Sequence, residues 1–280
     1  MRVLKGHGTE NDFVIVPDLD GAIELTPGLV RALCDRRAGV GGDGVLRVVR
    51  CENDPDGKPF AGDAEYFMDY RNADGSLAEM CGNGIRVFWQ YLIRSGLVRD
   101  SAAVATRGGI TRVQTRTDGD ISVHMGLPLV LADRPVATAA PLSRPAIAAV
   151  RMPNPHVVVQ VDAAELDTLD LTRPPVVVPP LPDGQNVEFV VPVGPGHLRM
   201  RVHERGVGET RSCGTGICAA VVAAATTAGS AADGSTWRVD VPGGTCQVTW
   251  HPDGGIELIG PAVIVAELDL DDDWLARVAG

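Results

Sequence analysis

Lysine is almost absent from this 280-residue chain, which contains only Lys5 and Lys58 and takes nearly all of its positive charge from arginine. Pyridoxal-phosphate enzymes hold their cofactor as a Schiff base on a lysine, so little in this sequence supports that chemistry. The formal net charge of −11 argues against a nucleic-acid partner, because phosphate contacts require clustered Lys and Arg side chains. The acidic residues are spread along the chain and indicate a solubilising surface.

Long apolar runs are missing as well. The longest, residues 217–225, is shorter than the ~20 residues that a membrane-spanning helix requires. Residues 1–8 contain no apolar segment of the kind found in signal peptides. We therefore expect a cytoplasmic protein without membrane contact, long enough for one large domain or two medium ones.

The six cysteines form no Cys-x-x-Cys pair, so neither a zinc site nor a dithiol redox site is indicated, and no metal site is predicted. An isolated cysteine in a cytoplasmic protein is by default a small buried apolar residue. We predict this structural role for four of the cysteines: Cys34, Cys51, Cys218 and Cys246. Cys81 and Cys213 lie in a different context.

The motif Cys-Gly-[Asn/Thr]-Gly-Ile occurs twice, within residues 80–86 and 212–218. Each copy opens an apolar run that predicts a helix, and the two runs end before Gly96 and Gly229 as helices with a glycine cap do. The second run is apolar nearly all round, which predicts a helix buried inside its domain.

The similarity continues beyond both helices. Gly-Gly pairs at 108–109 and 243–244 lead into strand-like segments at 110–114 and 245–250. A duplicated unit explains these matches, with one central helix and one cysteine in each half. Because helices and strands alternate irregularly and many strands are short, we predict an α+β fold rather than a doubly wound α/β sheet.

The remaining segments give weaker signals. Residues 27–37 predict a helix, and 45–50 a strand, with a glycine-rich turn between them. The glycines at 39–44 match G-x-G-x-x-G, but a dinucleotide site needs a strand before the motif and a helix after it, so we reject that interpretation. Residues 128–155 predict the crossing between the halves and the first edge strands of the second, and 174–182 an ordered loop.

A cysteine at the start of a helix lies beside unpaired backbone N–H groups and the positive end of the helix dipole. This environment favours thiolate and lowers a thiol pKa. The same N–H groups can hold a substrate carboxylate, and the neighbouring glycines let the backbone approach it. Two such cysteines in matching halves suggest two acid/base groups on opposite faces of one carbon, which cofactor-free racemisation requires.

The chain resembles the diaminopimelate epimerase family over its whole length. The resemblance rests on ordered motifs: Gly-Thr-Glu-Asn-Asp-Phe at 8–13, Arg-Asn-Ala-Asp-Gly-Ser at 71–76, Met-Cys-Gly-Asn-Gly at 80–84, Asn-Pro-His at 154–156, Glu-Arg-Gly-Val-Gly-Glu-Thr at 204–210 and Cys-Gly-Thr-Gly at 213–216.

This resemblance implies the conversion of LL- to meso-2,6-diaminopimelate without a cofactor, with Cys81 as proton donor and Cys213 as proton acceptor. It implies that His156 and Glu204 tune the thiol pKa values. The residues implied to bind substrate are Asn11, Asn72, Gly82, Asn83, Asn154, Asn186, Glu204, Arg205, Gly214 and Thr215. Such an isomerase serves lysine and peptidoglycan precursor synthesis.

The resemblance also implies two pseudo-symmetric halves, each a curved sheet around a central helix, with the active site in the cleft between them and a homodimeric assembly. We place the halves at 1–125, completed by 268–280, and at 126–267. The chain departs from common family patterns at Val87, where many relatives carry cysteine, and at Asp43-Gly44, where some carry a substrate-contacting glutamine. The role of Asp43 and Gly44 is left unassigned.

Competing interpretations make distinct predictions. An epimerase acting on histidine or hydroxyproline would keep both thiols but would not need residues for a second amino-acid end. A non-catalytic binding protein would not exchange an α-proton, and a thiol redox protein would stay active with Cys81 and Cys213 oxidised to a disulfide. Locally, His156 could be a hydrogen-bonded histidine at a strand start, and Glu204 and Arg205 a surface ion pair. Adjacent strand residues point to opposite faces, however, so we favour substrate contacts for the last two.

Overall fold

The computed structural model describes residues 1–278, which form two compact units. The first contains Met1–Val123 and the segment that begins at Pro261, and the second is His124–Gly260. The sequence had placed residues 261–267 in the second half. They belong to the first unit because strand β20, Val263–Asp269, pairs antiparallel with strand β1, Arg2–Gly8.

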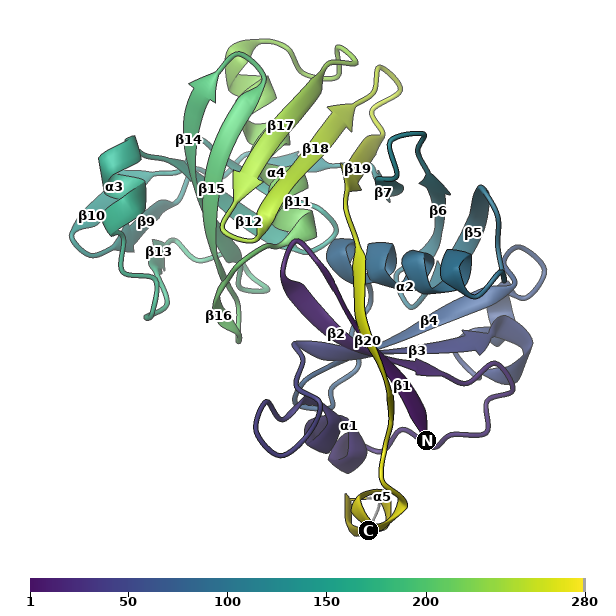
Figure 1. Cartoon of the computed structure of the whole chain (residues 1–280). Coiled ribbons are helices and arrows are strands. Elements are labelled where there is room, and N and C mark those ends of the chain that lie inside the picture. Colours follow the sequence, from purple (N-terminus) through teal and green to yellow (C-terminus); the bar gives the residue numbers. More distant parts are fainter. Residues whose placement is uncertain (279–280) are drawn as a thin grey trace. The chain divides into compact units, whose positions relative to one another are not determined.

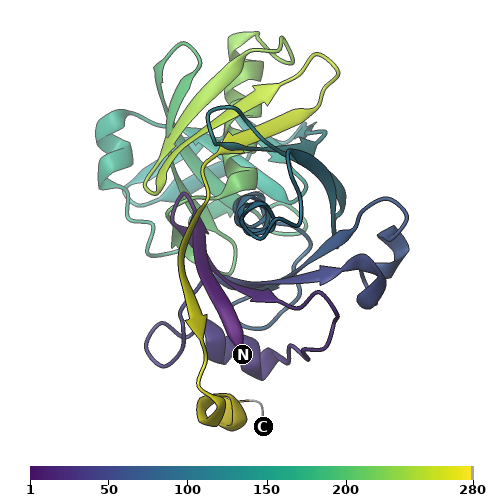
Figure 2. The same cartoon turned by 45° about the vertical axis from the view of Figure 1, so that its right-hand side comes forward.

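The first unit is a curved sheet with the order β20-β1-β2-β3-β4-β5-β6-β7. Helix α2, Gly82–Arg94, contacts β1 to β4 and β20, and Figure 2 shows it nearly end-on with strands curving around it. The other strands are β2 (Asn11–Pro17), β3 (Gly44–Arg50), β4 (Tyr66–Asn72), β5 (Ser101–Thr106), β6 (Gly109–Thr115) and β7 (Ile121–Gly126).

Smaller helices cover the outer side of this sheet. Helix α1, Pro27–Cys34, begins after Thr26, whose hydroxyl accepts from the N–H of Leu29. It packs against α5, Asp272–Val278, so segments from opposite ends of the chain share one apolar cluster (Figure 1). The predicted helix at 27–37 is thus shorter than expected, since Asp35 is already extended. Two 3-10 turns, Cys51–Asn53 and Lys58–Phe60, follow β3.

The second unit is a curved sheet with the order β8-β11-β12-β14-β15-β17-β18-β19 around helix α4, Gly214–Ala228. Nearly all of α4 is buried, as its apolar composition predicted, and it contacts β11, β12, β14, β15, β17, β18 and β19 (Figure 1). These strands are β8 (Leu129–Leu131), β11 (Ala148–Arg151), β12 (Pro155–Gln160), β14 (Asn186–Gly194), β15 (His197–Glu204), β17 (Thr236–Val241), β18 (Gly244–Trp250) and β19 (Ile256–Gly260).

A separate three-stranded sheet in the second unit consists of β9 (Val136–Ala139), β10 (Leu142–Pro145) and β13 (Val176–Val178). Strand β13 lies within the segment that the sequence predicted as an ordered loop; its pairing partner β9 is about 40 residues away, so only tertiary structure reveals it. Helix α3, Ala163–Thr168, and the short strand β16, Gly208–Thr210, complete the unit.

The two units repeat one another strand for strand. From β1 to β7 the successive pairs are antiparallel, parallel, antiparallel, parallel, antiparallel and antiparallel. The series β11, β12, β14, β15, β17, β18 and β19 gives the same succession. Helix α2 precedes β5 as α4 precedes β17. The predicted duplication and α+β class are confirmed.

Candidate functional site

Cys81 and Cys213 occupy equivalent positions as the N-caps of α2 and α4. Both have extended backbone angles, and each Sγ accepts a hydrogen bond from the N–H three residues ahead, from Gly84 at 3.3 Å and from Gly216 at 3.4 Å. A side chain in this position satisfies one of the unpaired N–H groups of the first turn, a task that serine or threonine usually performs. The sequence therefore placed both thiols correctly at helix N-termini.

Asn11 is the hydrogen-bonding partner of Cys81 in the first unit. Its Oδ1 lies 3.7 Å from Sγ of Cys81 and accepts from Nδ2 of Asn83 at 3.1 Å. Its Nδ2 donates to Oδ2 of Asp43 at 2.7 Å, so Asp43, whose role the sequence leaves unassigned, contacts a predicted site residue. Arg86, a residue that the sequence analysis missed, is fully buried and donates to Oδ1 of Asn83 at 2.6 Å. These contacts fix which way both amides face.

Asn72 ends β4 and lies in a turn. Its Nδ2 donates to Oγ of Ser76 at 3.0 Å, and its carbonyl accepts from the N–H of Gly75 at 2.9 Å. This is the local role that asparagine commonly has. Gly82 and Asn83 are the first two residues of α2, as Gly214 and Thr215 are of α4.

Cys213 is almost fully buried and is surrounded by polar side chains of its own unit. Nδ2 of Asn186 lies 3.8 Å from Sγ, and Oγ1 of Thr215 lies 3.5 Å from it. Glu204, at the end of β15, hydrogen-bonds to the thiol and accepts from the Thr210 hydroxyl. Three predicted site residues, Asn186, Glu204 and Thr215, therefore meet at this thiol.

Burial raises the pKa of Cys213 well above its ordinary value, and the carboxylates of Glu204 and Glu188 raise it further. The hydrogen bonds from Thr215 and from the Gly216 N–H oppose this rise but do not overcome it. The expectation of a lowered pKa is therefore wrong for Cys213, because a helix N-terminus is a weaker influence here than desolvation. Burial also raises the pKa of Glu204.

His156 is fully buried at the start of β12 and contacts two oxygens. Its Nδ1 lies 2.7 Å from Oε1 of Glu188, and its Nε2 lies 3.0 Å from Oδ1 of Asn154. The sequence prediction included His156 and Asn154 but missed Glu188. The available signal was a single glutamate within the otherwise apolar run of β14, from Val187 onward.

Arg205 and Asn186 are also joined. The backbone N–H of Arg205 donates to Oδ1 of Asn186 at 2.9 Å, which turns the amide nitrogen of Asn186 toward Cys213. The guanidinium of Arg205 is exposed and donates to the carbonyl of Asp183. The side chain of the adjacent Glu204 instead contacts Thr210 and Cys213. A simple ion pair between Glu204 and Arg205 therefore does not account for the position of Glu204.

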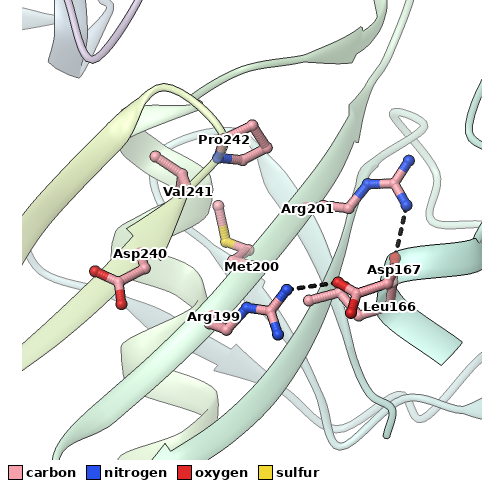
Figure 3. A pocket seen from close by; sticks show the side chains of 8 residues that line it. All are labelled: Leu166, Asp167, Arg199, Met200, Arg201, Asp240, Val241 and Pro242. Carbon is pink, nitrogen blue, oxygen red and sulfur yellow. Dashed lines mark hydrogen bonds and ion pairs between the residues drawn. The ribbon is translucent and has the colours of Figure 1, made fainter. Parts of the chain in front are cut away.

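A surface pocket of about 330 Å³ lies elsewhere in the second unit, between β15, β17 and the end of α3 (Figure 3). Arg199 pairs with Asp167, while Arg201 donates to the carbonyl of Leu166. None of the predicted site residues lines it, and its charged groups are already paired: Arg201 with Glu209, and Asp240 with His197 and Arg238. The remaining lining residues are Met200, Asp240, Val241 and Pro242.

Metal-binding clusters and membrane-spanning helices are both absent from the part of the chain that the structure describes. Among residues 1–278, no group of three His, Cys, Asp or Glu side chains is arranged to hold a metal ion. None of the helices in that range combines the length and apolar composition that crossing a membrane requires. The four cysteines predicted to be structural, Cys34, Cys51, Cys218 and Cys246, are all buried.

Comparison with solved structures supports the fold. A PhzF-family phenazine biosynthesis protein of Bacillus anthracis superposes with a TM-score of 0.71 at 18% identity, covering 97% of this chain and 99% of its own. A probable proline racemase of Agrobacterium radiobacter K84 gives a TM-score of 0.69 at 16% identity, covering 97% and 93%. At identities this low, these comparisons support a shared fold and nothing more.

Sequence comparison is far more specific. The diaminopimelate epimerase family matches residues 3–130 and 148–265. The diaminopimelate epimerase of Streptomyces coelicolor is 56% identical, over 98% of this chain and 97% of its own length. That of Thermobifida fusca is 50% identical, over 96% and 98%. With both N-cap cysteines in place, this chain belongs to the diaminopimelate epimerase family.

Proposed function

We propose that this protein epimerises LL-2,6-diaminopimelate to meso-2,6-diaminopimelate without a cofactor, using Cys81 and Cys213 as its two acid/base groups. The observation that carries the proposal is the equivalence of the two thiols, each an N-cap of the central helix in one of two repeated units. Family membership supports the substrate, because the close relatives carry the name of this activity.

The reaction needs two groups because the α-proton leaves from one face of the carbon and returns to the other. In the LL-to-meso direction, Cys213 as thiolate takes the α-proton and becomes a thiol, while the Cys81 thiol gives its proton to the opposite face and becomes a thiolate. The next turnover requires each thiol to exchange its proton. The first turns of α2 and α4 would receive the carboxylate beside the reacting carbon, where negative charge develops.

Glu204 supports the deprotonation of Cys213. The thiol has a raised pKa and therefore needs a proton acceptor, and the carboxylate of Glu204 is hydrogen-bonded to it. Because burial also raises the pKa of Glu204, this carboxylate is a stronger base than an exposed glutamate. The buried His156 lies near enough to Glu204 for its charge to oppose that rise.

The remaining predicted site residues would bind the substrate. We assign the distant amino-acid end to polar side chains, and the reacting end to the helix N-termini. The first group is Asn11, Asn72, Asn154, Asn186, Glu204 and Arg205, and the second is Gly82, Asn83, Gly214 and Thr215. We also infer a cytoplasmic location. The inferred homodimer and the place in lysine and peptidoglycan precursor synthesis rest on the family resemblance.

The proposal is tested by incubating the purified, reduced protein with LL-2,6-diaminopimelate in deuterated water, with no cofactor added. We expect meso product that carries deuterium at the α-carbon. Exchange with another amino acid, but not with this one, would keep the chemistry and replace the substrate. No exchange with any amino acid would favour a non-catalytic binding protein.

A further inference from the structure

Glu188 is a charged side chain that the proposed mechanism does not use, although it lies inside the site of the second unit. It is 0% exposed. Its Oε1 contacts Nδ1 of His156, and its Oε2 has no hydrogen-bond partner among residues 1–278. A buried carboxylate is costly unless a positive charge and hydrogen bonds compensate it. The residues around Glu188 should therefore supply the positive charge or the hydrogen bonds that compensate its buried negative charge.

The repeated unit provides a direct comparison. In register, β2 and β3 correspond to β12 and β14, so Phe13 and Leu46 are the counterparts of His156 and Glu188. Both counterparts are fully buried and apolar, and they lie near the helix residue Gly84. The same fold position thus holds an apolar pair behind the Cys81 helix and a polar pair behind the Cys213 helix. The fold alone does not require a carboxylate there.

The contacts of His156 indicate which charge compensates Glu188. Nδ1 faces a carboxylate oxygen and Nε2 faces the amide oxygen of Asn154, both within hydrogen-bond distance. A carboxylate oxygen and an amide oxygen accept hydrogen bonds, so this arrangement is satisfied when both ring nitrogens donate, which is the imidazolium form. With its Oδ1 held by Nε2, the half-buried amide of Asn154 turns its NH₂ group away from the ring.

We propose that Glu188 is a positioning residue: its carboxylate holds His156 as an imidazolium, and His156 in turn orients Asn154 so that its NH₂ group faces a carboxylate of the substrate. The assignment of Asn154 to substrate binding rests on the proposed function. The other charged or titratable groups that influence the same region are Glu204 on β15 and Cys213 at the start of α4.

The first test reads His156 directly and needs no substrate. Long-range proton–nitrogen correlation spectra of protein labelled with ¹⁵N-histidine distinguish the imidazolium from each neutral tautomer, and a His156→Phe variant assigns the signal. At pH 7 we expect two protonated ring nitrogens in the native protein and one in Glu188→Gln. A neutral His156 in the native protein, or an imidazolium that survives in Glu188→Gln, would overturn the proposal.

Asp240→Asn is the matched control. Asp240 contacts Nε2 of His197 at 2.6 Å in the same unit, so this variant also neutralises a carboxylate that is paired with a histidine. It should alter the His197 signal, leave the His156 signal in place and leave the epimerase kinetics unchanged.

The second test measures kinetics. In Glu188→Gln we expect KM to rise by about tenfold, because an oriented hydrogen bond to a charged substrate group is lost. We expect kcat to change less. The double variant His156→Phe/Glu188→Leu copies the apolar pair of the first unit and should fold, because an apolar pair of similar volume replaces a buried ion pair. It should show the same rise in KM.

A native KM in the folded double variant would overturn the positioning role. A failure of the proposed function is distinguishable, because the native protein would then not epimerise diaminopimelate at all, whereas the histidine spectra would still report the Glu188–His156 pair.

Discussion

A Cβ atom placed on Gly216 would lie 2.6 Å from Oε1 of Glu188, closer than real Cβ atoms come to any neighbour. The glycine in the first turn of α4 therefore leaves room for the buried carboxylate behind it. In the first unit a Cβ on the equivalent Gly84 would lie 3.3 Å from both Leu46 Cδ2 and Cys81 Cβ, which is tight but tolerable.

Gly216→Ala should accordingly destabilise the protein by about 1–3 kcal/mol, because Glu188 or the helix must move. Gly84→Ala should be close to neutral, since the gain in helix propensity of about 1 kcal/mol offsets the tight contacts. Urea denaturation of the two variants provides the measurement. Equal losses of stability would show that the Glu188 carboxylate does not constrain this position.

The six thiols should react at very different rates in the native protein. Burial raises the pKa of Cys34 to about 12 and that of Cys51 to about 11, so both remain unreactive thiols at pH 8. Cys81 is half-buried, whereas the other five cysteines are buried. Iodoacetamide at pH 8, with peptide mass spectrometry, should label Cys81 first; labelling of Cys34 at the same rate would contradict the structure.

Replacing Glu204 by glutamine should make Cys213 more acidic. Burial is the main cause of the raised thiol pKa, and the negative charge of Glu204 adds to it. Removing that charge stabilises the thiolate, so the pKa of Cys213 falls and its alkylation rate rises at a lower pH than in the native protein. Turnover should nevertheless decrease, because the proton acceptor is lost. An alkylation profile that is unchanged or moves to higher pH would refute this electrostatic role.

Asp69 should make a large, pH-dependent contribution to stability. It is fully buried; burial by itself would raise its pKa, but hydrogen bonds from Arg71 and Arg107 lower the pKa overall. Asp69→Asn removes the buried carboxylate that Arg71 and Arg107 share and should cost about 3–5 kcal/mol at neutral pH.

The sign of the pH dependence follows from the lowered pKa. The contribution of Asp69 is complete above the carboxyl pKa of the unfolded chain, about 4, and is lost as the pH falls through the lower pKa of the folded state. Denaturation of native protein and Asp69→Asn between pH 2 and 7 should show the difference shrinking in acid. A difference that is constant over this range would contradict the assignment.

The sequence predicted those features that local patterns encode. The duplicated Cys-Gly-x-Gly-Ile motif located both helices and both N-cap thiols, and Gly229 at φ +73° ends α4 as its position suggested. Strand β13 and the membership of residues 261–267 in the first unit could not be read in the same way, because both depend on pairing with distant strands.

The electrostatics of the site could not be predicted from the sequence either. The N-terminal position of Cys213 on its helix is a local feature and suggests an acidic thiol. Burial raises the pKa of Cys213 instead, and so do the carboxylates of Glu204 and Glu188, which other strands bring to the thiol. Glu188 is identified as a site residue only by the pairing of β12 with β14 and by the contacts of His156 with both Glu188 and Asn154.

The most direct test of the two-thiol account is α-hydrogen exchange in deuterated water by Cys81→Ala and Cys213→Ala, measured separately with the LL and meso isomers. Neither variant should epimerise. Cys81→Ala retains Cys213 and should exchange the α-hydrogen of the LL isomer without inverting it, whereas Cys213→Ala should exchange only the meso isomer. Epimerisation by either variant at the native rate, or exchange of the same isomer by both, would contradict a mechanism in which each thiol serves one face of the carbon.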